Sequence, residues 1–188
     1  MISVGSVQVV FRSAVAADTP AIVALVESAY RGDSSREGWT TEADLLDGQR
    51  TDREQVRESF DDPSVAFCLA TLRGVVVGSV CVRVDPPGLA HIGMFAVSPA
   101  LQRAGLGSAL LVEAEQEAAA RGAQVARMTV IEQRPELLAW YGRRGYRDTG
   151  EREPFPYGDP RFGLPRRDDL RFVVLRKSLG LNAAPATR

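Results

Sequence analysis

The sequence is poor in the residues that metal sites, disulfides and nucleic-acid surfaces need. Its 188 residues include one histidine, His91, and two cysteines, Cys68 and Cys81, so no Cys/His cluster has metal-ligand spacing. Each cysteine lies in an apolar run with strand character, which indicates two small buried residues rather than a disulfide. The formal net charge of −1 argues against a nucleic-acid surface as the main function. We therefore expect no metal cofactor and no nucleic-acid partner.

Long apolar runs are also missing. No stretch reaches the roughly 18 apolar residues of a membrane-spanning helix, and the N-terminus lacks the basic region and apolar core of a secretory signal. We expect a cytoplasmic protein without a membrane partner. Lysine is nearly absent too, because Lys177 is the one lysine among 23 basic residues. Arginine, which binds carboxylates and phosphates through paired hydrogen bonds, supplies the rest.

The length and the 45% hydrophobic content suit one domain of ordinary size with a real core. We expect residues 1–180 to form this domain and the small residues of 181–188 to fray. The expected order is strand, helix, helix, three strands, helix, strand, helix, strands, which indicates a mixed α/β sheet with helices on both faces. The segments that we expect to form strands or helices are Val7–Arg12, Asp18–Ala29, Thr51–Phe60, Ser64–Leu72, Val75–Val84, Leu89–Val97, Ser108–Arg121, Gln124–Ile131, Leu137–Arg144 and Leu170–Leu179.

The most informative feature is the glycine-rich run from Gln102 to Gly107. It lies between an apolar strand-like stretch, Leu89–Val97, and a helix-like stretch, Ser108–Arg121. A turn from strand to helix leaves several N–H groups free at the positive end of the helix dipole, where they suit a phosphate. Gly105 and Gly107 carry no Cβ, so an anionic ligand can approach the backbone closely.

Two common phosphate-binding loops do not fit this turn. A nucleoside-triphosphate loop places Lys and then Ser or Thr after its last glycine, whereas Ser108 and Ala109 follow here. A dinucleotide-binding fingerprint has Gly or Ala three residues after its second glycine, where this chain has Leu110. A plain tight turn between a strand and a helix is the alternative to a ligand site.

The pattern Gln-x-x-Gly-x-Gly, after a strand that ends in Met94-Phe95-Ala96-Val97-Ser98-Pro99, resembles the coenzyme A loop of the GNAT N-acetyltransferase superfamily. A second motif agrees, since a helix bearing Tyr141 ends at Gly145 before the aromatic Tyr146. The resemblance covers about residues 7–179. It implies a GNAT-like mixed, mostly antiparallel sheet flanked by helices and splayed between its fourth and fifth strands.

The resemblance implies acetyl-coenzyme A as co-substrate. The pyrophosphate is expected over the backbone of residues 103–108, and the pantetheine arm along the fourth strand. Arg134 stands where the related ribosomal-protein acetyltransferases place a coenzyme-contacting asparagine, seven residues before the tyrosine. The expected coenzyme-binding residues are Phe95, Ala96, Val97, Gln102, Arg103, Ala104, Gly105, Leu106, Gly107, Ser108 and Arg134.

Three residues are candidates for proton transfer. By resemblance Tyr141 is the general acid that protonates the leaving thiolate, and a phenol with a pKa near 10 stays protonated for that task. His91 lies six residues before Val97, the offset of the base in histone-type members, and strand alternation predicts that it shares a face with Phe95 and Val97. An ordinary strand histidine is the alternative. Glu132 is the rival base, although the ribosomal-protein enzymes carry their glutamate three positions earlier.

Two long polar segments, Arg31–Asp52 and Glu153–Asp169, are expected to cover a small amphipathic or anionic acceptor. Solvated surface loops are the alternative. The expected substrate-binding residues are Trp39, Glu42, Tyr157 and Arg161.

The predicted function is direct transfer of acetyl from acetyl-coenzyme A to a primary amine of a small molecule. A protein or peptide N-acetyltransferase, a coenzyme A-binding module without transfer activity, and an interaction protein that uses only the fold are the alternatives. The sequence does not decide whether the protein forms a homodimer.

Overall fold

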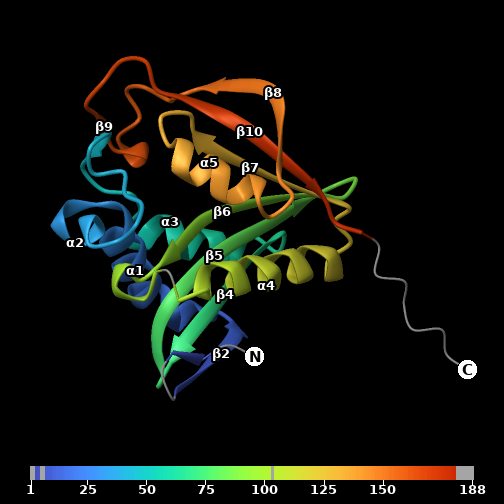
Figure 1. Cartoon of the computed structure of the whole chain (residues 1–188). Helices are drawn as coiled ribbons and strands as arrows, with labels where there is room; N and C mark the ends of the chain where they lie inside the picture. Colours follow the sequence, from blue (N-terminus) through green and yellow to red (C-terminus); the bar gives the residue numbers. More distant parts are fainter. Residues whose placement is uncertain (1–2, 5–6, 103, 181–188) are drawn as a thin grey trace, which may run out of the picture.

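The computed structural model describes residues 3–4, 7–102 and 104–180. These residues form one sheet in the strand order β1-β2-β4-β5-β6-β7-β10-β8 (Figure 1). Neighbouring strands are antiparallel except β6 and β7, which are parallel. The mixed, mostly antiparallel sheet of the prediction is therefore confirmed. The strands are β1 (Ser3–Val4), β2 (Val7–Ser13), β4 (Val65–Leu72), β5 (Val75–Asp85), β6 (Leu89–Val97), β7 (Val125–Ile131), β8 (Arg147–Pro154) and β10 (Arg171–Ser178).

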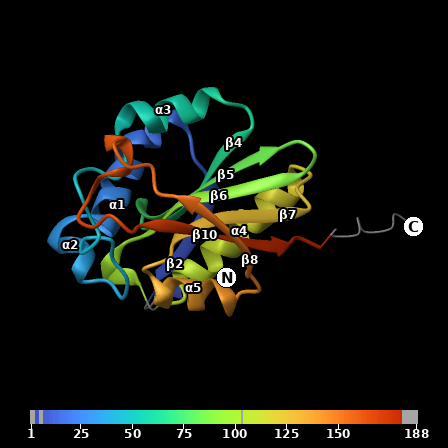
Figure 2. The same cartoon turned by 90° about the horizontal axis from the view of Figure 1, so that it is seen from above.

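Helices cover both faces of the sheet. Figure 2 shows α1 (Thr19–Tyr30) and α3 (Arg53–Asp61) on one side, and α4 (Leu106–Ala120) and α5 (Pro135–Gly142) on the other. An apolar stripe along α4 is buried against β4 and β5. This stripe comprises Leu106, Leu110, Leu111, Ala114 and Ala118. In the described part of the chain, no helix is both long enough and apolar enough to cross a membrane.

The predicted splay between the fourth and fifth strands is present between β6 and β7. They pair only where Leu89–His91 meets Val125–Arg127, after which the two strands separate. The C-terminal half of β6 therefore has no strand partner on its β7 side. This opening creates space for a ligand beside the backbone of β6.

A β-bulge in β6 changes which side chains share a face. Gly93 pairs with Cys81 and Ala96 pairs with Ser79, so β6 has one more residue than β5 across this interval. Met94, inside the bulge, adopts a left-handed φ of 44°.

The extra residue reverses the alternation of side chains beyond it. Phe95 and Val97 pack with the α4 side of the core, like Ile92 before the bulge, whereas Ala96 packs with the α1 side. His91 is an odd-numbered residue before the bulge, so it lies on the α1 side. The prediction that His91 shares a face with Phe95 and Val97 is wrong, because it assumed an unbroken strand.

The two long polar segments contain more structure than the sequence indicated. The first includes α2 (Gly32–Arg36) and β3 (Leu46–Asp47), and β3 pairs with β9 (Leu164–Pro165) of the second. Arg147–Pro154, which no sequence pattern assigned to a strand, forms β8, an exposed edge strand whose charged residues give no hydrophobic pattern. Short 3₁₀ turns occur at Ala16–Asp18, Pro99–Leu101 and Pro160–Phe162. The expected frayed tail, 181–188, lies outside the described residues.

Candidate active site

A cavity of about 520 Å³ lies where β6 parts from β7. Its walls come from the end of α1, the loop after α2, the C-terminal part of β6, the start of α4 and one face of α5. Most of the predicted coenzyme-binding residues line it together with Trp39 and Tyr141. The lining residues are Ala29, Tyr30, Trp39, Thr40, Phe95, Ala96, Val97, Gln102, Gly105, Gly107, Ser108, Arg134, Leu137, Trp140, Tyr141, Arg143 and Arg144.

The start of α4 forms one end of the cavity. Gly105 is the N-cap in a left-handed conformation, with φ of 80°, which only glycine adopts without strain. No described side chain caps this helix, so the first-turn N–H groups remain available to a ligand. Gly107 has an ordinary backbone, and a Cβ there would lie 3.5 Å from the Trp140 ring. The two glycines thus differ, since Gly105 allows the turn and Gly107 keeps the cavity open.

Positive charge gathers at the same end. The Arg144 guanidinium lies 3.5 Å from the centroid of the Trp140 ring and donates through Nε to Ser108 Oγ at 3.2 Å. Arg143 also lines the cavity. Burial and then the neighbouring Arg143 lower the pKa of Arg144 below its ordinary value. Sequence reasoning missed this pair, although both arginines lie within the Tyr141 motif, just before Gly145.

Gln102 connects the loop after α2 to β6. Its Oε1 accepts a hydrogen bond from the Trp39 backbone N–H at 2.9 Å, and its Nε2 donates to the Val97 carbonyl at 3.2 Å. Gly38 makes this approach feasible, because a Cβ there would lie 2.4 Å from Gln102 Oε1. The side chain of Gln102 therefore fixes the position of Trp39 at the cavity wall.

Tyr141 has the properties of a proton donor facing the cavity. It is 5% exposed, and its hydroxyl makes no hydrogen bond with the described residues. Burial, followed by the nearby Tyr30, raises its pKa above the ordinary value, so the phenol stays protonated at neutral pH. Its ring packs edge-on against Trp140 and Phe95, with centroids 4.9 and 6.5 Å away.

The two predicted bases lie away from this cavity. His91 pairs with Asp85 through Nε2 at 3.1 Å, and burial followed by Arg83 lowers its pKa. Glu132 accepts hydrogen bonds from Arg171 and Arg152, which hold its pKa below the usual value. Neither residue lines the cavity, and the described residues that do line it include no Asp, Glu or His.

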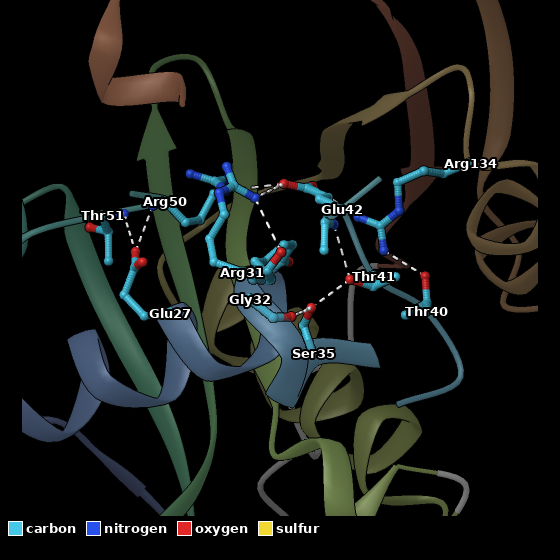
Figure 3. Close-up of polar contacts among 12 residues, drawn as sticks. Glu27, Arg31, Gly32, Ser35, Thr40, Thr41, Glu42, Arg50, Thr51 and Arg134 are labelled. Atoms are coloured by element: carbon cyan, nitrogen blue, oxygen red, sulfur yellow. Dashed lines mark hydrogen bonds and ion pairs between the residues drawn. The ribbon is translucent and has the colours of Figure 1, made fainter. Parts of the chain in front are cut away.

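Glu42 lies in a buried cluster of charged side chains next to the cavity (Figure 3). Arg134 Nη1 donates to its Oε1 at 2.9 Å, and Arg31 Nη1 donates to its Oε2 at 2.8 Å. Arg50 Nε lies 3.9 Å from the same Oε2. Burial alone would raise the pKa of Glu42, but the three arginines outweigh it and lower that pKa. Glu42 is therefore a fixed carboxylate.

The remaining predicted site residues do not line the cavity. Tyr157 accepts a hydrogen bond from the Leu170 N–H at 2.7 Å and donates to the Arg167 carbonyl at 3.1 Å. Arg161 pairs with Asp159, in its own loop. Ala104 is exposed and Leu106 is buried in the core. The prediction for Arg103 lies outside the described residues.

Comparison with solved structures shows the same fold. The ribosomal-protein-S18-alanine N-acetyltransferase from Escherichia coli matches with a TM-score of 0.69 at 16% identity, over 96% of this chain and 99% of that chain. An IAA acetyltransferase from Bacillus cereus matches with 0.64 at 18% identity, over 91% and 99%. The structure of yncA from Salmonella typhimurium with its cofactor acetyl-CoA matches with 0.68 at 18% identity, over 96% and 99%. No curated protein matches the sequence significantly.

A comparison with family models matches the part of the chain that contains the cavity-lining residues. Residues 22–146 match the model of the acetyltransferase (GNAT) family. The matched segment runs from α1 to the end of the Tyr141 motif, so it includes the glycine-rich turn and the separated strands. This chain belongs to the GNAT acetyltransferase family.

Proposed function

We propose that this protein transfers the acetyl group of acetyl-coenzyme A directly to a primary amine of a small molecule. One observation carries the proposal. A single cavity joins the open N–H groups at the start of α4 to the unpaired phenol of Tyr141. The first feature suits an anionic carrier, and the second suits protonation of a leaving thiolate.

The residues at this cavity fit coenzyme A. The first turn of α4 offers N–H groups, and Arg143 and Arg144 add positive charge for phosphates. The separated edge of β6 offers backbone groups to an extended amide-containing arm, as an added strand would use them. Gly107 leaves room beside Trp140 for such an arm.

The chemistry follows from a few groups. Acetyl-coenzyme A supplies the acetyl group as a thioester, so a C–N bond forms as the C–S bond breaks. Tyr141 donates its phenolic proton to the sulfur that leaves, and recovers a proton from solvent afterwards. The cavity walls bring amine and thioester together, which by itself removes much of the entropic barrier. The acceptor enters as the free amine or first gives its ammonium proton to water, because the described cavity residues offer no carboxylate or imidazole. In either case the nitrogen loses one further proton to water as the amide forms.

A small acceptor is favoured over a protein. The two long polar segments pair through β3 and β9, and Arg166 forms an ion pair with Asp47 across them at 2.5 Å. Trp39 and Thr40 from the first segment form part of the cavity wall. We infer that the paired segments limit the access of a folded protein to this cavity, whereas a small molecule can enter.

An amine library tests this proposal. The purified protein would be incubated with acetyl-coenzyme A and individual amines, with free thiol read as coenzyme A is released and the N-acetyl product identified by mass spectrometry. We expect thiol release that depends on the amine and matches the acetylated product. Transfer only to peptides or proteins would favour the alternative acceptor class. Binding of the coenzyme without any transfer would leave a coenzyme A-binding module.

A further inference from the structure

The charges beside the cavity do not balance. Three arginines, Arg31, Arg50 and Arg134, surround the single carboxylate of Glu42. Arg31, Arg134 and Glu42 are 7%, 4% and 6% exposed, so water does not solvate this excess freely. Buried charges are costly unless they are paired and hydrogen-bonded. Glu136 supplies a second carboxylate, 3.7 Å from Arg134 Nε, so one positive charge in this cluster lacks a counter-ion in the described part of the chain.

Several donors of the same arginines also lack acceptors. Arg31 Nε, Arg31 Nη2 and Arg134 Nε are buried without a hydrogen-bond partner among the described residues. Glu136 Oε1 lies 3.7 Å from Arg134 Nε, which exceeds hydrogen-bond distance. The guanidinium of Arg50 makes no hydrogen bond with the described residues and touches Glu42 only at 3.9 Å. Guanidinium groups with free donors match the planar oxygens of a carboxylate or the oxygens of a phosphonate.

This positive charge borders the cavity. Of the three arginines Arg134 lines the cavity, as does Tyr30, whereas Arg31 and Arg50 are not among the lining residues. The guanidinium carbons of Arg50 and Arg134 lie 5.3 and 5.9 Å from the centroid of the Tyr30 ring. The Tyr30 hydroxyl in turn binds the Phe95 carbonyl on β6. The guanidinium groups of Arg50 and Arg134 are thus linked through Tyr30 to the strand that borders the proposed transfer site.

Glu42 does not offer a site for a cation. Its Oε1 and Oε2 already accept hydrogen bonds from Arg134 and Arg31, and its pKa stays low because of them. A polyamine or a second ammonium group near this cluster would meet a net positive field. The cluster therefore discriminates by charge in favour of anions.

We infer that the acceptor carries an anionic group, a carboxylate or a phosphonate, close to its amine, and that Arg50 and Arg134 bind this group beside Tyr30. The inference rests on the proposed transfer to a small amine and names the class of that amine. An acceptor of this class supplies the missing negative charge and the missing hydrogen-bond acceptors at once. An α-amino acid or an aminophosphonate is the simplest molecule that meets this description.

Matched pairs of acceptors test the inference. Each pair consists of an anionic amine and the same amine without its acid group. The pairs are phenylalanine with phenethylamine, leucine with isoamylamine, histidine with histamine, glycine with methylamine, and aminomethylphosphonate with methylamine. Steady-state rates would be measured at saturating acetyl-coenzyme A, and binding of the corresponding N-acetyl products would be measured by calorimetry at saturating coenzyme A.

The variant Arg50→Gln gives the sharpest contrast, because the Arg50 side chain is 28% exposed and its loss leaves Glu42 paired with Arg31 and Arg134. Loss of one charged hydrogen bond should raise KM for the acceptors with an acid group roughly 10- to 100-fold and leave that of their partners without the acid group unchanged. Arg36→Gln is the matched control, since Arg36 pairs with Asp44 at the surface and does not line the cavity.

The outcomes separate this inference from the proposed function. The anionic-acceptor inference is supported if the member of a pair with the acid group has the higher kcat/KM and its acetylated product binds more tightly. Both preferences should be lost in Arg50→Gln. The inference is overturned if the amines without an acid group are acetylated equally well or better, although the proposed function then stands. If no amine is acetylated, the proposed function fails, and the binding of the N-acetyl products alone decides whether the anionic subsite exists. Equal binding of both products, or binding of neither, would again overturn the anionic subsite.

Discussion

The Tyr30 hydroxyl donates a 2.5 Å hydrogen bond to the main-chain carbonyl of Phe95. This contact joins the last residue of α1 to the bulged part of β6, where that strand borders the cavity. Burial, followed by the charge of Glu42, raises the pKa of Tyr30, so the phenol remains a donor at neutral pH. The backbone beside the proposed transfer site is thereby fixed from the α1 side.

Tyr30→Phe removes this hydrogen bond while keeping the ring. The Phe95 carbonyl would lose its described side-chain partner, so unfolding free energy should fall by about 1–3 kcal/mol. We also expect a lower kcat, because the strand beside the reacting groups is less well positioned. Urea denaturation and steady-state kinetics measure the two effects. A stability loss with an unchanged kcat would restrict Tyr30 to a structural role.

Tyr141→Phe tests the proposed general acid. The variant keeps the buried ring and removes the proton, so kcat should fall about 10²- to 10⁴-fold while coenzyme affinity holds. Because burial raises the pKa of Tyr141, wild-type kcat should not decline as pH rises through about 10, where a free tyrosine ionises. A variant within a factor of two of wild type, with chemistry rate-limiting, would assign Tyr141 to packing alone.

His91→Ala should retain the wild-type rate. The bulge puts His91 on the opposite face of β6 from Phe95, and its imidazole pairs with Asp85 outside the cavity lining. We expect the same kcat/KM and the same pH profile as wild type with a single acceptor. Loss of an ascending limb near the pKa of an ordinary histidine, about 6.5, would restore His91 as the base. Glu132→Gln provides the parallel control and should also stay active.

The buried cluster gives a prediction about stability. Glu42→Gln leaves Arg31 and Arg134 buried without their carboxylate, which should cost about 3–5 kcal/mol of unfolding free energy at pH 7. In wild type, the pKa of Glu42 is lower in the folded state than in the unfolded chain, so its contribution is present above about 4.3. That contribution is lost as pH falls through the folded pKa. Denaturation curves measured across acidic pH would show a shallower loss for Glu42→Gln.

Some features of this fold and site follow from local sequence signals. The glycine-rich turn, the stripe of α4 and the position of Tyr141 depend on residues close together in the chain. Phosphate-loop chemistry and helical periodicity reveal such features. The separation of β6 from β7 was implied by the family resemblance rather than by any residue pattern.

Other features depend on contacts that no local pattern encodes. Methionine rarely adopts positive φ, so nothing in the sequence indicated the bulge at Met94 that reverses the faces of β6. Glu42 and Arg134 are 92 positions apart, and charged residues in polar segments usually face solvent. The pairing of β3 with β9 involves two residues from each segment and extends across more than half the chain. Tertiary packing alone brings these residues together.

Gly107→Val tests the central claim most directly. A Cβ at Gly107 meets no clash within the protein, the nearest atom being 3.5 Å away, but a larger side chain would extend into the cavity beside Trp140. Gly142→Val is the matched control, because Gly142 ends α5, has nothing within 4 Å of its Cβ position and does not line the cavity.

The decisive measurement is acetyl-coenzyme A affinity by calorimetry, combined with thiol release and N-acetyl product formation on an accepted amine. For wild type and Gly142→Val we predict binding and equal amounts of thiol and product. For a folded Gly107→Val we predict affinity weakened more than about tenfold, with transfer reduced accordingly. Unchanged affinity and transfer in folded Gly107→Val would contradict the account, because the cavity at the start of α4 would then not be the coenzyme site.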